Sequence, residues 1–117
     1  MNKDKLMELL VDMDEGLMYC ADDPEFYEEM LAEFMAEGRK RTEELKHFFI
    51  DADWKSYGIA AHSVKSTSRM IGASALSERA REQEFAAKLG NGEAVAAAHT
   101  DFISEYETLL SGLEKLL

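Results

Sequence analysis

Three residues near the middle of the chain have the types and spacing that phosphoryl chemistry needs. His62 is followed by Lys65 and Arg69, and steps of three and seven residues place side chains on one face of a helix. A neutral imidazole is a good nucleophile near neutral pH, because its unperturbed pKa is about 6.5. Neighbouring cations can balance the charge of a transferring phosphoryl group. These residue types at this spacing are therefore chemically sufficient for a histidine that accepts a phosphoryl group, with Lys65 and Arg69 as the cations that would screen its oxygens.

The charge around His62 is opposite to that of the whole chain. Asp and Glu number 24 against 13 Lys and Arg, which gives a formal net charge of −11. No acidic residue occurs between Trp54 and Ser77, where an even spread would place about five. We interpret this window as a local positive patch that suits a phosphoryl group. A solvated helix face with a chance deficit of acids is the alternative.

A helix over about 52–71 has to position these residues. Six residues at steps of three and four form one stripe that is predicted to be buried: Trp54, Tyr57, Ala61, Val64, Ser68 and Ile71. His62 lies roughly 140° from the middle of that stripe, so we expect its ring to point into solvent. Lys55, Gly58 and Ser66 are its other predicted surface neighbours. The small residues Gly58 and Ser66 would let another protein come close to the imidazole.

Four other segments are predicted to be helical, over about 3–20, 24–49, 74–89 and 92–116, and none reads as a strand. Apolar residues recur in them at steps of three and four, and the abundant Ala, Leu, Met, Glu and Lys favour helix. Because the loops are short, sequential helices should be antiparallel neighbours. The predicted fold class is all-α, an antiparallel up-down four-helix bundle with an additional N-terminal helix. We expect it to form one domain over 1–117.

Capping residues mark the predicted helix ends. Asp23 is expected to cap the second helix, Asp51 or Asp53 the third, and Ser74 the fourth, whereas Gly72 ends the third. The inward faces of the first two helices are predicted to hold Leu6, Leu9, Leu10, Met13, Leu17, Phe26, Met30, Phe34, Leu45 and Phe48.

The composition argues against several kinds of protein. Cys20 is the single cysteine, so no intrachain disulfide can form, which suits a reducing cytosol. No apolar run approaches the roughly 20 residues of a membrane span, and the N-terminus lacks the pattern of a signal peptide. The negative net charge argues against nucleic acid and anionic membranes as partners, and is otherwise explained by solubility. We expect a cytoplasmic monomer that does not insert into membranes.

The other histidines and the hydroxyl residues point to no second kind of chemistry. His47 follows a charged stretch at a helix end, where a surface role is expected. His99 lies on or beside the apolar stripe of the last helix, where a partly buried, hydrogen-bonded ring is expected. The histidines lack the spacing of metal ligands, so we expect no cofactor or metal of the protein's own. Ser63 and its neighbours lack the elbow or glycine loop of a serine enzyme.

The stretch 61–73 resembles the signature of histidine-containing phosphotransfer (HPt) domains. That signature has a histidine, a lysine three residues later, a small residue next, and a glycine ten residues after the histidine, matched by His62, Lys65, Ser66 and Gly72. The small residue is often glycine in the family, so Ser66 is a departure that bears on partner fit. The resemblance extends over nearly the whole chain.

The next predicted helix also resembles the family. Leu76, Ser77 and Ala80 fit its pattern, and Glu84 matches a family Glu or Gln that can lie near the histidine. Gln83 is a departure, because an apolar residue is common before that acid.

The resemblance implies a four-helix bundle that carries a phosphoryl group on His62. It implies Lys65 as the cation beside that group, Ser66 as the point of closest partner approach, and Glu84 in a supporting role. Lys55 and Gly58, which the helix geometry places beside His62, are the other residues expected to contact the partner. The implied partners are response-regulator receiver domains, whose aspartates exchange the phosphoryl group, and a sensor or hybrid histidine kinase. Any Mg²⁺ is expected on the receiver.

Two alternatives remain open from the sequence. The chain can be a helical docking module that binds a receiver or kinase without transferring phosphate. It can also be phosphorylated on His62 directly by the ATP-binding domain of a kinase, as in chemotaxis kinases.

Overall fold

The computed structural model describes residues 2–117, so that only Met1 of the predicted domain lies outside the described residues. Across this range the chain forms six helices and no strand. The helices are α1 (Lys3–Glu8), α2 (Met13–Tyr19), α3 (Pro24–Ile50), α4 (Trp54–Met70), α5 (Ser74–Lys88) and α6 (Gly92–Leu116). The predicted all-α class is confirmed.

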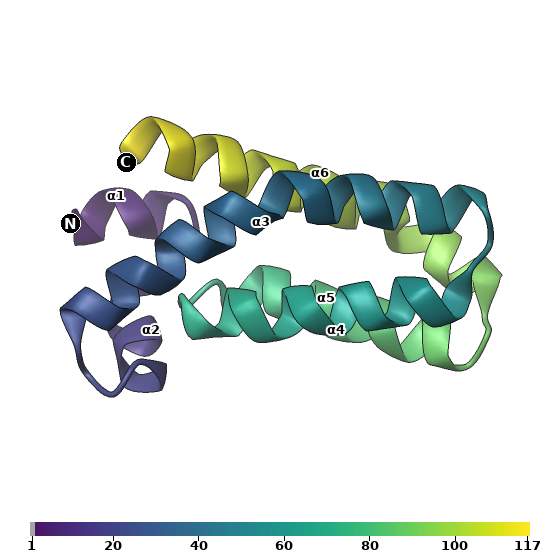
Figure 1. Ribbon diagram of the computed structural model, residues 1–117, viewed down its shortest axis with the longest axis horizontal. Coiled ribbons are helices and arrows are strands. Elements are labelled where there is room, and N and C mark those ends of the chain that lie inside the picture. The colour runs from purple at the N-terminus through teal and green to yellow at the C-terminus, as the bar shows by residue number, and fades with distance from the viewer. Residues whose placement is uncertain (1) are drawn as a thin grey trace.

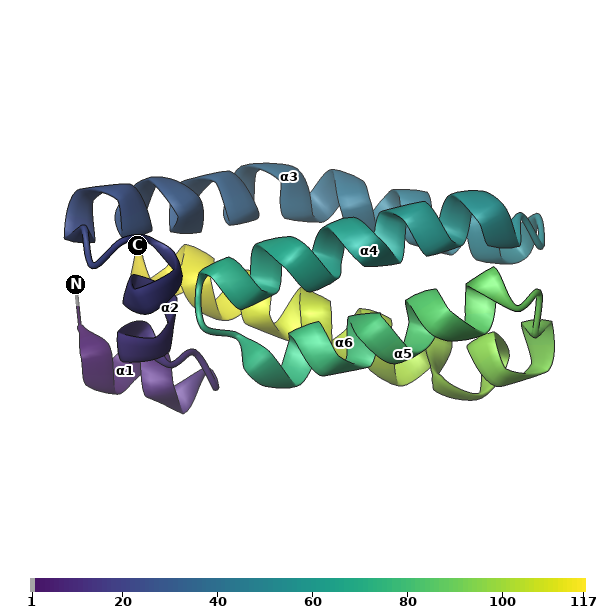
Figure 2. The same ribbon diagram turned by 90° about the horizontal axis from the view of Figure 1, so that it is seen from below.

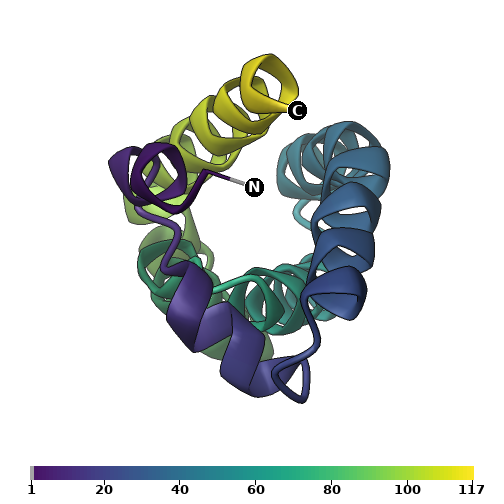
Figure 3. The same ribbon diagram turned by 90° about the vertical axis from the view of Figure 1, so that its left-hand side faces the viewer.

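The four long helices alternate in direction and form the bundle (Figure 1). Each packs against the next along the chain, and α6 packs back against α3, which closes the ring seen end-on in Figure 3. Leu45, Val64, Ala80 and Phe102, one from each long helix, are almost fully buried in the centre. No helix within residues 2–117 has both the length and the apolar character needed to cross a membrane.

Helix α4 begins and ends where its flanking residues predict. The carboxylate of Asp53, and not that of Asp51, accepts a hydrogen bond from the Ser56 N–H at 3.1 Å. Gly72 follows the helix with a φ of +85°, a conformation that favours glycine. Between these ends the predicted stripe faces the core, where its residues are buried except for a half-buried Trp54.

The prediction of a single helix over 3–20 was wrong. The chain turns at Leu10, whose φ is +62°, and resumes as α2 after Asp12, whose carboxylate accepts a hydrogen bond from the Glu15 N–H. Val11 is fully buried at this turn, whereas Leu10 is exposed instead of facing inward. The break allows the Asp12 N–H to donate to the carbonyl of Gly72 at 2.9 Å.

Two details of the predicted helix starts were also wrong. Ser74 does not cap α5, because Ala73 occupies the capping position and forms no side-chain cap. At the start of α3, Asp23 is the cap, as predicted. Phe26, however, lies on the exposed side of that helix, and its neighbour Tyr27 is the residue buried in the core. The Tyr27 hydroxyl donates to the Ile71 carbonyl at 2.8 Å, a bond that phenylalanine could not make.

Candidate functional site

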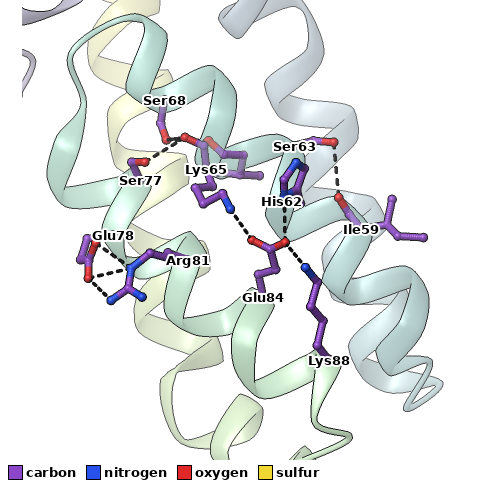
Figure 4. A network of polar contacts seen from close by, with 11 residues as sticks. Ile59, His62, Ser63, Lys65, Ser68, Ser77, Glu78, Arg81, Glu84 and Lys88 are labelled. Atoms are coloured by element: carbon purple, nitrogen blue, oxygen red, sulfur yellow. Dashed lines mark hydrogen bonds and ion pairs between the residues drawn. The ribbon is translucent and has the colours of Figure 1, made fainter.

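His62 lies on the outer face of α4 with 56% of its side chain exposed. One ring nitrogen is fixed, because Nδ1 lies 2.8 Å from Oε2 of Glu84 on the neighbouring helix α5 (Figure 4). An ionised carboxylate only accepts hydrogen bonds, so the imidazole donates from Nδ1. In the neutral ring this leaves the free lone pair on Nε2.

Glu84 is a buried carboxylate that gathers three donors. Its side chain is 5% exposed, and besides His62 it pairs with Lys65 Nζ through Oε1 and with Lys88 Nζ through Oε2, each at 2.8 Å. Burial raises the pKa of Glu84, but the hydrogen bonds from Lys65, Lys88 and His62 outweigh burial and bring the pKa to about 2. The group is therefore ionised at neutral pH and balances the charge of one lysine.

The close approach of α4 and α5 brings these side chains together. A Cβ added at Gly58 would lie 3.4 Å from the Cβ of Ala87 and 3.9 Å from the Glu84 carbonyl, so the helices are in contact at this level. One turn beyond His62, the Ser77 hydroxyl donates to the Lys65 carbonyl at 2.8 Å. Figure 2 shows the two helices running alongside each other over this length.

Gln83 sets the orientation of Glu84 from inside the bundle. The buried Gln83 amide donates to the Tyr57 hydroxyl at 3.1 Å and to the Val95 carbonyl at 2.9 Å. Consecutive side chains on a helix point about 100° apart, so a core-facing Gln83 directs Glu84 to the boundary with α4. The amide at this position, a departure from the family pattern, therefore has a bonding role. Tyr57 in turn bonds Nδ1 of the buried His99 at 2.8 Å, as expected for a hydrogen-bonded ring.

An open groove of about 700 Å³ runs beside His62 between α4 and α5. Its lining comprises Trp54, Lys55, Gly58, Ile59, His62, Ser63, Glu84, Ala87, Lys88 and Gly90. The Ile59 side chain is exposed there. The groove thus combines cationic and apolar surface next to the imidazole.

The remaining predicted site residues do not all surround His62. Lys55 is exposed and lines the groove. Gly58, expected on the surface, is buried because α5 packs over it, although it contributes to the groove floor. Ser66 is exposed but faces a separate hollow beside α3. Arg69 is exposed, and its charge, after that of Arg81, helps to lower the pKa of Glu78 on α5.

Sequence reasoning missed Lys88 and misjudged the local charge. The acid-free window is real, but Glu84 from α5 places one carboxylate inside the predicted positive patch. Glu84 and Lys88 are four residues apart on one helix, a spacing at which a Glu–Lys pair is expected. That spacing was the available signal for Lys88.

A family model for the Hpt domain matches residues 29–117, which include all of α4, α5 and α6. No curated protein and no solved structure matched the chain.

Within residues 2–117 no group of three or more His, Cys, Asp or Glu side chains is arranged to hold a metal ion.

Proposed function

The chain belongs to the Hpt domain family, and from this membership and the α4 site we infer that it carries a phosphoryl group on His62. Family membership gives it a histidine phosphotransfer role in phosphorelays, in which Hpt domains interact with receiver domains and kinases. We assign the acceptor atom as Nε2 of His62, the donor and acceptor as receiver aspartates, and Glu84 as a positioning residue. The observation that carries this assignment is an exposed imidazole whose Nδ1 is held by a buried carboxylate.

Phosphoryl transfer to His62 needs no general base on this chain, because the neutral imidazole attacks through a free lone pair. The Nε2 lone pair attacks the phosphorus of an aspartyl phosphate, and the phosphorus–oxygen bond breaks with its electron pair leaving on the aspartate. The ring keeps its Nδ1 proton and becomes an imidazolium, whose charge the Glu84 carboxylate balances from 2.8 Å. In the reverse step an aspartate oxygen of a receiver attacks the phosphorus, the nitrogen–phosphorus bond breaks, and its electron pair returns to Nε2. The receiver supplies its own Mg²⁺ in this scheme.

The groove beside His62 is the surface that we assign to the receiver. Lys55 and the exposed Ile59 lie along it, so it can contact a partner through charge and apolar area. Gly58 takes part by keeping α4 and α5 close rather than by direct contact. Ser66 and Arg69 lie toward the other end of α4 and would meet the edge of the partner.

Phosphotransfer from a labelled receiver tests the proposed function. Mixed with a phosphorylated receiver domain, the wild type should acquire an acid-labile label, and His62→Gln should acquire none. His47→Gln is the matched control, because His47 is also exposed on a long helix but pairs with Asp51 instead of a buried acid, and it should label like the wild type. Equal labelling of His62→Gln and the wild type would overturn the assignment. Incubation with ATP and a kinase catalytic core separates direct phosphorylation from transfer through a receiver.

A further inference from the structure

The two lysines that bind Glu84 have different surroundings. Lys65 bonds Oε1, and its side chain is 23% exposed. Lys88, in the last turn of α5, bonds Oε2, and its side chain is 66% exposed. Figure 4 shows the two side chains approaching the carboxylate from different directions. One lysine is therefore enclosed between helices, whereas the other extends through solvent.

Lys88 shares its carboxylate oxygen with the imidazole. His62 Nδ1 and Lys88 Nζ each lie 2.8 Å from Oε2, so the two nitrogens are separated by no more than twice that distance. Lys88 also lines the groove onto which the His62 ring opens. A flexible four-carbon stem allows its ammonium group to move several ångströms without any backbone change.

Phosphorylation of Nε2 changes which of these pairs is favourable. The ring becomes an imidazolium that claims Oε2 more strongly through Nδ1, and about two negative charges appear on the other side of the ring. An exposed lysine loses little free energy when it leaves a carboxylate, because water solvates the freed ammonium group. Removing the enclosed Lys65 would instead leave a buried charge without one of its partners, which is costly.

Building on the proposed function, we propose that Lys88 is the catalytic cation that contacts the phosphoryl oxygens on His62, whereas Lys65 is a positioning residue that stays with Glu84. This reverses the role that family resemblance implies for Lys65. In the resting protein Glu84 holds both lysines. In the phosphorylated protein Lys88 leaves Oε2 and pairs with the phosphoryl group, while the bonds from Lys65 and from Nδ1 remain.

Phosphorus NMR of the phosphohistidine tests this division of roles. The protein is phosphorylated with phosphoramidate, and the ³¹P chemical shift is followed from about pH 8.5 to about pH 5.5. This range spans the second ionisation of a phosphoryl group, at about pH 6. A cation in contact with the group lowers the titration midpoint. Lys88→Gln should therefore raise the midpoint by about 0.5 or more, and Lys88→Arg should restore it. The same Lys88→Gln change should slow transfer to a receiver about tenfold.

Two further variants make the test specific. Lys65→Gln should lower the resistance to urea and change the ³¹P midpoint less than Lys88→Gln does. Lys55→Gln removes another groove cation, two turns from His62, and should leave the midpoint unchanged. A wild-type midpoint in Lys88→Gln, or a larger change in Lys65→Gln, would overturn the proposal. Absence of a wild-type phosphohistidine signal, or its persistence in His62→Gln, would instead refute the proposed function itself.

Discussion

Replacing Glu84 with glutamine removes one buried negative charge while preserving the size of the side chain and one oxygen acceptor. The ionised carboxylate is stabilised in the fold by three donors, from Lys65, Lys88 and His62. In the unfolded chain those donors are dispersed and the carboxyl group has an ordinary pKa. The ionisation of Glu84 is therefore coupled to folding, and Glu84→Gln should remove that coupling.

The magnitude follows from the two pKa values. Burial opposes ionisation, but the three donors bring the pKa from 4.5 to about 2, and each tenfold change in proton affinity corresponds to about 1.4 kcal/mol. Glu84 ionisation thus contributes about 3 kcal/mol to the free energy of unfolding. Because the folded pKa is the lower one, this contribution is present above about pH 4.5 and declines as the pH falls toward 2. About 2 kcal/mol of it should be lost by about pH 3.

Urea unfolding followed by circular dichroism at pH 7 and at about pH 3 measures this contribution. Between these conditions the wild type should lose about 2 kcal/mol more than Glu84→Gln does. The control is Glu82→Gln, because Glu82 is exposed on the same helix and the substitution changes the net charge by the same amount. This control should lose as much free energy of unfolding between the two pH values as the wild type does. If wild type and Glu84→Gln decline equally with pH, the three-donor account of Glu84 is wrong.

Two other predictions concern the scaffold and use the same unfolding assay. Gly72→Ala should lower the free energy of unfolding by more than about 2 kcal/mol, because a Cβ there would lie 1.9 Å from the Asp12 carbonyl oxygen at a φ of +85°. Gly90→Ala is the control, with a φ of +67° and no atom within 4 Å of the added Cβ, and should cost about 1 kcal/mol. Equal costs would contradict the role assigned to the contact between Gly72 and Asp12. Burial, and after it the charge of Lys46, lowers the pKa of His99, so the free energy of unfolding of the wild type should fall as the pH drops from about 7 to about 5. His99→Asn keeps an acceptor for the Tyr57 hydroxyl and should show a smaller fall. An unchanged pH dependence in this variant would show that His99 is not the responsible group.

The position of His62 was predictable because it depends on one helix alone. The apolar stripe of α4 sets which side is buried, and the ring direction follows from 100° per residue. The ends of that helix were predictable for the same reason, since Asp53 and Gly72 act on adjacent backbone groups. Features determined within one or two turns of chain can be derived from sequence in this way.

The partners of Glu84 were not predictable by the same route. They come from α4 and α5, and which side chains meet depends on the register between the two helices, which Gly58 and Ser77 help to set. Periodicity gives the face of each helix but not this relative shift. The break at Leu10 has a similar origin, because a continuous helix also satisfies the apolar pattern, whereas the observed break allows Asp12 and Gly16 to contact the α4–α5 turn.

That turn links the N-terminal helices to the site. The Asp12 N–H donates to Gly72 at 2.9 Å, and the Tyr27 hydroxyl donates to Ile71 at 2.8 Å. A Cβ at Gly16 would lie 2.7 Å from the Ile71 carbonyl carbon, so α2 lies directly against the turn. These contacts fix the point from which α4 and α5 run, and hence the register that brings Glu84 to His62. Gly72 is therefore required by its φ of +85° and by the close approach of the Asp12 backbone, not by the chemistry of the imidazole.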